Sequence, residues 1–365
     1  MLNEFRVKGF KNFKEEVVFN LGDTRNYEFN QNCIKNNTIK TALLYGPNGS
    51  GKSNLGEAIF DIVLNLTDKN PEKSLYYPYF NLEKITPFVE FSYKFKFEED
   101  ILFYTYKKTS PERFAEEYLS INGQRIISYD FKKCIGYIFL NGAETLNQFL
   151  FNGDISFVRY VYKNSNLNKK DKNVQVFYKF FSFVEHMLFF RSLKENNYIG
   201  FTTGSENIAE GILNTNKLHD FQIFLQKNGI NYKLKADQAN KNILCEFPNG
   251  DVNLYRIASS GTWSLLLFFY WYTKMQDVSF VFIDEFDAFY HSTISKNMVE
   301  LLRDSDNLQA VLTTHNTDIM TNDLLRPDCY FLLKDGIIKS LPNATEKELR
   351  FAHNLQKMYK GGAFE

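Results

Sequence analysis

The stretch Leu43–Asn54, which reads LLYGPNGSGKSN, decides the fold of this chain. It predicts a short apolar strand, a glycine-rich turn and the first turn of a helix, and its pattern G-x-x-x-x-G-K-S is that of a phosphate-binding loop. Glycine allows backbone conformations that are closed to other residues, so successive N–H groups can point at one anion. The helix that follows adds unpaired amides and a partial positive charge at its N-terminus.

Two side chains complete this loop. Lys52 supplies a full positive charge for the β- and γ-phosphates of a nucleotide, and the Ser53 hydroxyl is a ligand for Mg²⁺. The sequence therefore predicts a nucleotide-binding protein, and the alternative is an ordinary strand–turn–helix. The residues expected to hold the nucleotide are Gly46, Pro47, Asn48, Gly49, Ser50, Gly51, Lys52, Ser53 and Asn54.

Length and composition limit the class of protein. A chain of 365 residues can form one large α/β domain or two smaller ones. Lys+Arg and Asp+Glu both number 43, which argues against a polybasic surface over the whole chain but leaves a local basic groove open. No apolar run approaches the length of a membrane span, and the N-terminus does not resemble a signal peptide. With four scattered cysteines, we expect a cytoplasmic protein with reduced thiols and no membrane contact.

Strand and helix signals extend the prediction along the chain. Alternating apolar and polar residues predict an antiparallel meander at 87–97, 101–108, 116–121 and 124–127. Apolar residues at helical spacing predict helices within 173–190 and 206–227. The other expected strands are 4–8, 15–21, 41–45, 231–236, 242–247, 252–256, 280–283, 309–313, 330–334 and 337–340, and the other expected helices are 54–66, 264–275, 295–303 and 345–359.

A second chemical signal is the stretch Phe280–Asp287, which reads FVFIDEFD. Its four apolar residues predict a buried strand that delivers Asp284 and Glu285 at its carboxyl end, where ligands bind in open α/β sheets. We expect Asp284 to hold Mg²⁺, directly or through water, and Glu285 to orient or deprotonate the water that attacks a γ-phosphate. Alone, such a strand end is more often a surface turn, and the phosphate loop in the same chain favours the catalytic interpretation.

Two more element ends carry polar residues. His315 follows the expected strand at 309–313 and can reach a γ-phosphate, although a lone histidine is more often a structural hydrogen-bonding group. The stretch Ala258–Trp263, which reads ASSGTW, precedes an apolar helix and by itself predicts only a capped helix N-terminus. The remaining histidines lack such a context and are expected to be structural.

This order of motifs resembles the ABC-type ATPases of the SMC, RecF and recombination-protein group. It is most similar to the compact bacterial AAA-15/AAA-21 ATPases of anti-phage defence, which include the abortive-infection (Abi/Rlo) and OLD-like proteins. The resemblance covers about residues 1–110 and 250–365. It implies an α/β fold, namely an ABC/SMC-type P-loop ATPase head with an antiparallel β lobe, formed by residues 1–140 and 230–365 and interrupted by a helical insertion at 141–229.

The resemblance also implies residue roles. The phosphate loop corresponds to the Walker A motif, and the strand that ends in Asp284 and Glu285 corresponds to Walker B with its catalytic glutamate. In that family the signature motif of one subunit caps the γ-phosphate held by another subunit, which implies ATP and Mg²⁺ as cofactors and a homodimer or higher oligomer. The signature here departs from the usual Leu-Ser-Gly-Gly-Gln form. The matching residues are Ser259, Ser260 and Gly261 for the signature, Asp287 for the D-loop and His315 for the switch histidine, with Gln124 or Gln148 as Q-loop candidates and Lys11 or Phe13 as adenine contacts.

Three functions remain open from the sequence. The first is an ATP-dependent dimeric switch in a bacterial defence system that controls a separate effector, a nuclease or a toxin. The second is a DNA-binding repair or recombination ATPase, for which Lys169, Lys170 and Lys172 are the tight basic cluster, although such a cluster is more often a solvated loop. A transporter ATPase subunit is the weakest of the three, because the 86–127 meander and the N-terminal hairpin resemble an SMC-type lobe rather than a transporter coupling surface.

Overall fold

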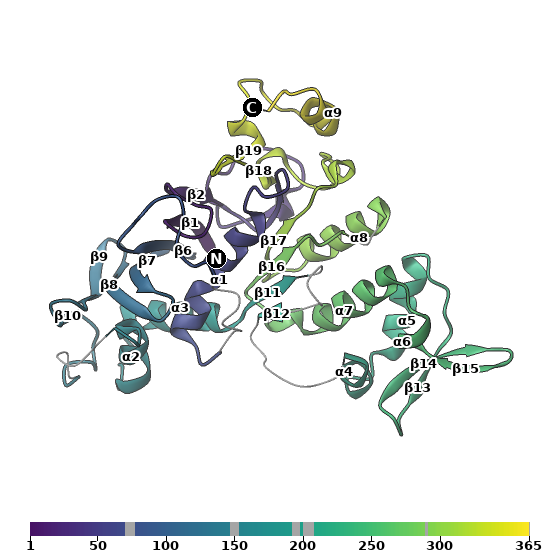
Figure 1. The fold of residues 1–365 in the computed structure, drawn as a ribbon, viewed down its shortest axis with the longest axis horizontal. Helices are drawn as coiled ribbons and strands as arrows, with labels where there is room; N and C mark the ends of the chain where they lie inside the picture. The colour runs from purple at the N-terminus through teal and green to yellow at the C-terminus, as the bar shows by residue number, and fades with distance from the viewer. Residues whose placement is uncertain (70–76, 147–152, 192–197, 200–207, 289–290, 365) are drawn as a thin grey trace.

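The structure is a computed structural model that describes residues 1–69, 77–146, 153–191, 198–199, 208–288 and 291–364. Within these residues the chain forms two seven-stranded sheets that lie side by side, with helices packed around them (Figure 1). One sheet is mostly parallel and carries the phosphate loop, and the other is antiparallel. The α/β class and the antiparallel lobe predicted from the sequence are confirmed.

The parallel sheet is the centre of the molecule. Its strand order is β12 (Tyr198–Ile199), β11 (Met187–Arg191), β16 (Phe280–Asp284), β17 (Gln309–Thr313), β5 (Thr41–Tyr45), β18 (Tyr330–Lys334) and β19 (Ile337–Ser340). Strands β5, β16 and β17 are buried along their whole length, as expected for parallel strands that are covered on both faces. Helix α1 (Lys52–Leu66) packs on this sheet at Gly56, where an added Cβ would lie 2.6 Å from the Phe282 ring.

The antiparallel lobe has the strand order β10 (Ile135–Ile138), β9 (Gln124–Asp130), β8 (Arg113–Ile121), β7 (Asp100–Ser110), β6 (Val89–Phe97), β1 (Leu2–Lys8) and β2 (Val17–Asn20). Along β6 buried and half-buried residues alternate, because one face of the sheet packs against helices and the other faces solvent. Helices α2 (Phe157–Asn164) and α3 (Lys172–Glu185) pack on this sheet, and α1 reaches it through the hydrogen bond from the Tyr93 hydroxyl to the Ala58 carbonyl oxygen at 3.0 Å. The expected meander and the hairpin of β1 with β2 are thus confirmed.

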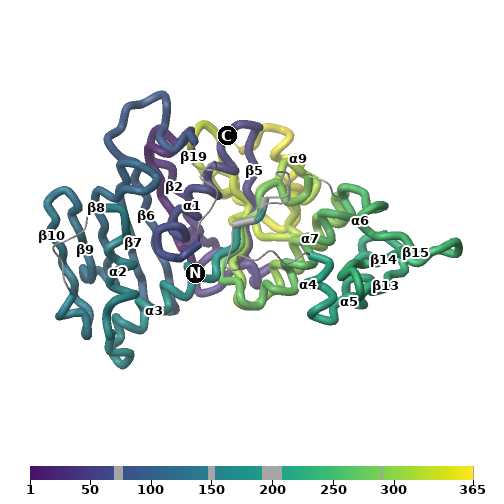
Figure 2. The backbone as a smooth tube through the Cα atoms, turned by 60° about the horizontal axis from the view of Figure 1, so that its bottom comes forward, coloured from purple at the N-terminus to yellow at the C-terminus, as the bar shows by residue number. Residues whose placement is uncertain are grey.

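A third group of elements lies at the other end of the molecule from the antiparallel lobe (Figure 2). Helix α7 (Ser260–Lys274) packs there against α4 (Ile208–Asn214) and α5 (Leu218–Lys227). Beside them lie β13 (Leu234–Asp237), β14 (Asn242–Phe247), β15 (Gly250–Asn253) and the short α6 (Leu254–Ile257). The remaining elements are β3 (Ile34–Lys35), β4 (Thr38–Ile39), α8 (Ser292–Arg303), α9 (Leu355–Lys360) and the 3₁₀ turns at Gln31–Cys33, Met275–Asp277, Thr317–Ile319, Pro327–Cys329 and Leu341–Asn343.

The segment 141–229 differs from the single helical insertion expected. It contains α2, α3, α4 and α5, but β11 lies between them and pairs in parallel with β16, the strand of Asp284, inside the central sheet. The run Met187–Arg191, which reads MLFFR, continues the apolar pattern of α3. Periodicity alone does not separate a short buried strand from the end of a buried helix, so the sequence assigned this run to a helix.

The C-terminal helix is also shorter than expected. Only Leu355–Lys360 is helical, whereas the sequence predicted a helix over 345–359. The Asn322 side-chain amide donates hydrogen bonds to the carbonyl oxygens of Arg350, Phe351 and His353 at 2.9–3.0 Å. Those carbonyls therefore serve a tertiary contact in place of a helix. Among the described residues, no helix has both the length and the apolar character that crossing a membrane requires.

Candidate functional site

The parallel strands bring three chemical segments to one edge of the sheet. Strand β17 pairs with β5 on one side and with β16 on the other, so the carboxyl ends of the three strands lie next to one another. The Thr314 amide donates to the Leu44 carbonyl at 3.2 Å, which fixes the segment after β17 beside the strand before the phosphate loop. The edge predicted from the sequence is therefore formed by these strand ends.

The phosphate loop adopts the backbone that its glycines predict. Gly49 and Gly51 have φ angles of +77° and +105°, which residues with a side chain rarely adopt. At Gly46 an added Cβ would lie 2.4 Å from the Leu333 carbonyl oxygen, so only glycine fits against β18. Pro47, Asn48 and Gly49 are exposed. The loop thus offers an open, glycine-lined turn directly before α1.

Lys52 lies inside this turn. Its Nζ donates hydrogen bonds to the carbonyl oxygens of Gly46 at 2.9 Å and Pro47 at 3.2 Å, and its side chain is buried. Burial lowers the pKa of Lys52, and the nearby carboxylates of Glu285 and Asp284 act in the opposite direction. The ammonium group is therefore held over the loop, on the side that faces the end of β16.

Asn12 is a site residue to which the sequence assigned no role. Its Nδ2 donates to the Ser50 carbonyl oxygen at 3.1 Å, and its Oδ1 accepts a hydrogen bond from Asn54 at 2.7 Å. The Asn12 side chain thus bridges the loop and the first turn of α1. A Cβ added to Gly51 would lie 2.4 Å from the Asn12 side-chain nitrogen, so only glycine fits there. The sequence places Asn12 in the turn between β1 and β2. Only the fold shows that this turn lies against the phosphate loop.

Asp284 and Glu285 are held by Thr313, another residue that the sequence did not single out. The Thr313 hydroxyl donates to Asp284 Oδ1 at 2.8 Å and accepts the Glu285 amide proton at 2.7 Å. Asp284 is buried, and Glu285 is half-buried with a left-handed backbone, φ +49°. Because a non-glycine residue rarely adopts this angle, the turn after β16 is a constrained one that directs Glu285 away from the strand.

His315 and Asp287 line a hollow of about 400 Å³ together with Glu285, Ser292 and Asn316. Burial lowers the pKa of His315, the Lys52 ammonium lowers it further, and Asp284 raises it, so the ring lies within electrostatic range of both groups. The Thr314 hydroxyl donates to both carboxylate oxygens of Asp287 at 2.8 Å, and burial raises the pKa of Asp287. Lys52, Asp284, Glu285 and His315 are thus gathered at one edge.

The Ser259–Gly261 segment is the N-terminus of α7. Ser259 caps the helix, because its hydroxyl oxygen accepts the Thr262 amide proton at 3.1 Å. Ser259 and Ser260 are exposed, and the described lining of the His315 hollow includes neither of them. The capped helix is confirmed, and within one chain these residues lie outside that hollow.

The lesser candidate residues have different outcomes. Gln124 begins β9 at an exposed hairpin on the far side of the antiparallel lobe, and Gln148 lies outside the described residues. Phe13 is buried in the core, and Lys11 pairs with Glu57, so neither ring nor ammonium is presented to an adenine. Lys172 pairs with Asp100 at 2.9 Å and the Lys169 ammonium lies over the Tyr178 ring, so the lysine cluster does not form one free basic face.

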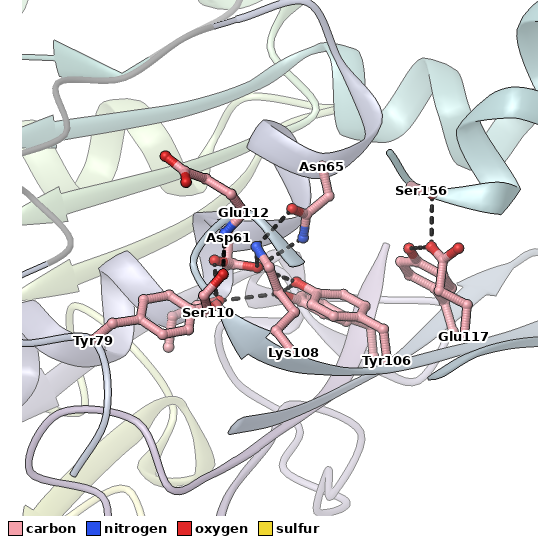
Figure 3. Close-up of polar contacts among 12 residues, drawn as sticks. Asp61, Asn65, Tyr79, Tyr106, Lys108, Ser110, Glu112, Glu117 and Ser156 are labelled. Atoms are coloured by element: carbon pink, nitrogen blue, oxygen red, sulfur yellow. Dashed lines mark hydrogen bonds and ion pairs between the residues drawn. The ribbon is translucent and has the colours of Figure 1, made fainter. Parts of the chain in front are cut away.

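A buried polar network connects α1 to the antiparallel lobe (Figure 3). Asp61, on α1, accepts hydrogen bonds from the hydroxyls of Tyr79 at 3.0 Å and Tyr106 at 2.8 Å, and its Oδ2 lies 3.4 Å from Lys108 Nζ. Asn65 bridges the pair at 2.7 and 2.9 Å. Lys108 is 1 % exposed, and burial lowers its pKa while Asp61 raises it. The helix that carries Lys52 is therefore tied to the lobe by an internal ion pair.

Comparison with known proteins gives one family match. A family described as "AAA domain, putative AbiEii toxin, Type IV TA system" matches residues 150–321, slightly less than half of the chain. The matched range contains Asp284, Glu285 and His315 but not the phosphate loop. A search of curated proteins found no match.

Three solved structures have a similar chain trace. The SMC head domain from Thermotoga maritima has 16 % identity, covers 93 % of this chain and 98 % of its own, and has a TM-score of 0.45. The Smc head domain with a coiled coil and joint from Pyrococcus yayanosii has 13 % identity, coverages of 98 % and 99 %, and a TM-score of 0.48. The recombination mediator protein RecF with ATP has 14 % identity, coverages of 93 % and 99 %, and a TM-score of 0.39.

We draw no function from likenesses at these identities and scores. The phosphate loop and the carboxylates at the end of β16 lie at the same edge of the sheet. The family match includes the residues of β16 and β17 at this edge. Together they mark this edge as the candidate nucleotide-binding site of the chain.

Proposed function

We propose that this protein is a Mg-ATP-binding and hydrolysing switch that works as a homodimer or higher oligomer and controls a separate effector protein in a bacterial anti-phage defence system. The observation that carries the ATPase part is the gathering of Lys52, Asp284, Glu285 and His315 at one edge of the sheet. The family match to an AbiEii-type domain supports the defence part.

The residues of the loop fit a nucleotide. The Ser50 hydroxyl oxygen is buried and has no hydrogen-bond partner within the described residues. An added Cβ on Gly49 would meet nothing within 4 Å, so the space over the loop is open. The amides of an exposed glycine turn, a helix N-terminus and a lysine ammonium form the donor set that a polyphosphate requires.

Each residue then has a role. Lys52 and the amides of the loop would hold the β- and γ-phosphates, and Ser53 with Asp284 would hold Mg²⁺, which neutralises phosphate charge when bound. Glu285 would orient the attacking water and accept its proton, and His315 would contact the γ-phosphate. Thr313 would keep Asp284 and the Glu285 backbone in place, since it contacts both.

The exposed N-terminus of α7 supports a site shared by two chains. Ser260 and the Gly261 amide, at the start of a fifteen-residue helix, offer donors to an anion. A second copy would supply that anion as the γ-phosphate on its own Lys52. ATP would therefore hold two copies together, and hydrolysis would release them.

The test is hydrolysis by Glu285→Gln, with Glu300→Gln on the exposed side of α8 as the matched control. We expect Glu285→Gln to bind ATP, to hydrolyse it at least a hundredfold more slowly, and to form a dimer on Mg-ATP. Hydrolysis at the wild-type rate would contradict the role of Glu285. Phage plating on cells that carry the native operon, with wild-type or Glu285→Gln protein, tests the defence role.

A DNA-binding repair or recombination ATPase is the alternative, because the same hydrolytic site serves either function. Lys170 of the lysine cluster is exposed and would be available to such a partner. DNA binding measured with and without ATP over a range of salt distinguishes the two. Binding that is tight, ATP-dependent and steeply salt-dependent would favour the alternative.

A further inference from the structure

Two neighbouring hollows follow the edge of the parallel sheet opposite to the phosphate loop. Lys40, Leu308, Ser279 and His186 each directly precede a strand, namely β5, β17, β16 and β11. Lys40 and Leu308 line an inner hollow of about 190 Å³, whereas Ser279 and His186 line an outer hollow of about 860 Å³. Since these strands have five residues each, the hollows lie about 16 Å from the phosphate loop edge.

The inner hollow is cationic. Lys35, Lys40, Lys96 and Lys179 line it, against the carboxylates of Glu98 and Asp306. The Lys40 ammonium is held by the Ser305 carbonyl oxygen at 3.0 Å, and Lys35 by the Asp306 carbonyl oxygen at 2.9 Å. Carbonyl oxygens orient these ammonium groups without cancelling their charge.

Lys40 is the buried member of this group. Burial lowers the pKa of Lys40, Cys33 and Asp306 raise it in part, and the neighbouring Lys35 lowers it again. An anion in the inner hollow would compensate the Lys40 ammonium for its burial and for the repulsion from Lys35. Glu98 already lies 3.6 Å from Lys179, so the carboxylates balance part of the positive charge but not all of it.

The outer hollow has a different lining. One face of α3 contributes Gln175, Tyr178, Lys179, Ser182 and Phe183, and Gln276 follows α7. Phe97 and Lys179 line both hollows, so the two lie next to each other. The outer part thus combines aromatic side chains with amides, which suits a ring system that carries hydrogen-bonding groups.

We propose that this pair of hollows binds a nucleoside phosphate, with its phosphate among the lysines and its base in the outer hollow. Lysine is a compact charge that suits phosphate, and a volume of several hundred cubic ångströms is typical of small-ligand sites. The site is separate from the phosphate loop and does not depend on hydrolysis there. The nucleoside phosphate can come from a free nucleotide or from the phosphorylated 5′ end of a nucleic acid.

The experiment uses the full chain with Lys52→Ala, which removes binding at the phosphate loop. Calorimetry measures the binding of AMP, GMP, CMP and UMP, and of oligothymidylate with and without a 5′-phosphate. Lys96→Ala and Lys179→Ala, each added to Lys52→Ala, test the inner hollow. The matched controls are Lys94→Ala, two residues before Lys96 on β6 and over the Phe103 ring, and Lys172→Ala, on α3 and paired with Asp100.

We expect one molecule of ligand per chain, and an affinity that falls roughly tenfold in each inner-hollow variant and stays unchanged in both controls. Binding of a mononucleotide identifies the free nucleotide as the source. Binding of only the 5′-phosphorylated oligonucleotide identifies a nucleic-acid end. Both outcomes support the site.

The proposal is overturned if no probe binds, or if Lys96→Ala and Lys179→Ala bind as tightly as the controls. Thermal unfolding of each variant shows whether the fold is intact. Hydrogen exchange provides a second measurement on Lys52→Ala alone: nucleotide should protect the amides of α3 and of residues 276–279. Protection confined to the phosphate loop would also overturn the proposal.

Discussion

The buried pair of Lys108 and Asp61 gives the most direct prediction about stability. In Lys108→Met the Asp61 carboxylate keeps its hydrogen bonds from Tyr79, Tyr106 and Asn65 but loses the cation that balances its charge. Removal of one partner from a buried ion pair costs about 3–5 kcal/mol, because the other charge stays buried without compensation. The three remaining donors place the expected loss at the lower end, about 3 kcal/mol.

Thermal unfolding is the assay, and we expect the midpoint to fall by about 4 °C, because the unfolding entropy of a chain of 365 residues is about 0.8 kcal/mol per degree. Lys107→Met is the matched control, since Lys107 is the preceding residue on β7 and its side chain is 25 % exposed beside Glu116. Such a surface pair is worth about 1 kcal/mol or less. A Lys108→Met midpoint equal to that of Lys107→Met would refute the reasoning.

The double variant tests the coupling of the pair. Asp61→Asn leaves Lys108 as a buried charge with neutral partners, so it should also destabilise the protein. The double variant Asp61→Asn/Lys108→Met has no charge left to compensate, and its loss should therefore be smaller than the sum of the single losses by about 1–3 kcal/mol. Additive losses would show that the two residues act independently.

Three further predictions concern other parts of the molecule. Burial raises the pKa of Glu117, so its contribution to stability is greatest below its unfolded pKa and is lost as the pH rises through its folded pKa. The difference in unfolding free energy between wild type and Glu117→Gln should therefore shrink from pH 5 to pH 8. A difference that stays constant with pH, as we expect for the exposed Glu116→Gln, would contradict this. Asn12→Ala removes the bridge between Ser50 and Asn54 and should raise the dissociation constant for ATP roughly tenfold, about 1.4 kcal/mol, without changing the unfolding midpoint by more than a few degrees; unchanged ATP affinity in equilibrium binding would remove Asn12 from the site. Gly56→Ala places a Cβ 2.6 Å from the Phe282 ring and should lower the free energy of unfolding by about 1–3 kcal/mol, although alanine favours helix; a stabilised variant would show that α1 can move away from the sheet.

The sequence was sufficient where a local pattern has one structural solution. The strands at 41–45, 309–313, 330–334 and 337–340 have the predicted bounds, because each is a short apolar run between turn signals. The glycine pattern likewise predicted the loop. Local sequence patterns were therefore enough to predict the strand ends where the expected phosphate-binding and metal-binding residues lie.

Tertiary contacts decided the rest. Asn12 and Thr313 act on residues far away in the sequence, so no spacing pattern could identify them. Met187–Arg191 is a strand because the sheet has a place for it beside β16, not because of its own periodicity. The lysines of the inner hollow come from four separate segments, and only the fold gathers them.

The central claim is that two copies of this chain close around ATP, with Lys52 of one copy facing Ser260 and Gly261 of the other. The most direct test is the solution mass of Glu285→Gln protein with Mg-ATP, alone and with Ser260→Arg added. We predict twice the mass of one chain for Glu285→Gln with ATP, and the mass of one chain without ATP or with Ser260→Arg. A single-chain mass for Glu285→Gln at saturating ATP would contradict the account.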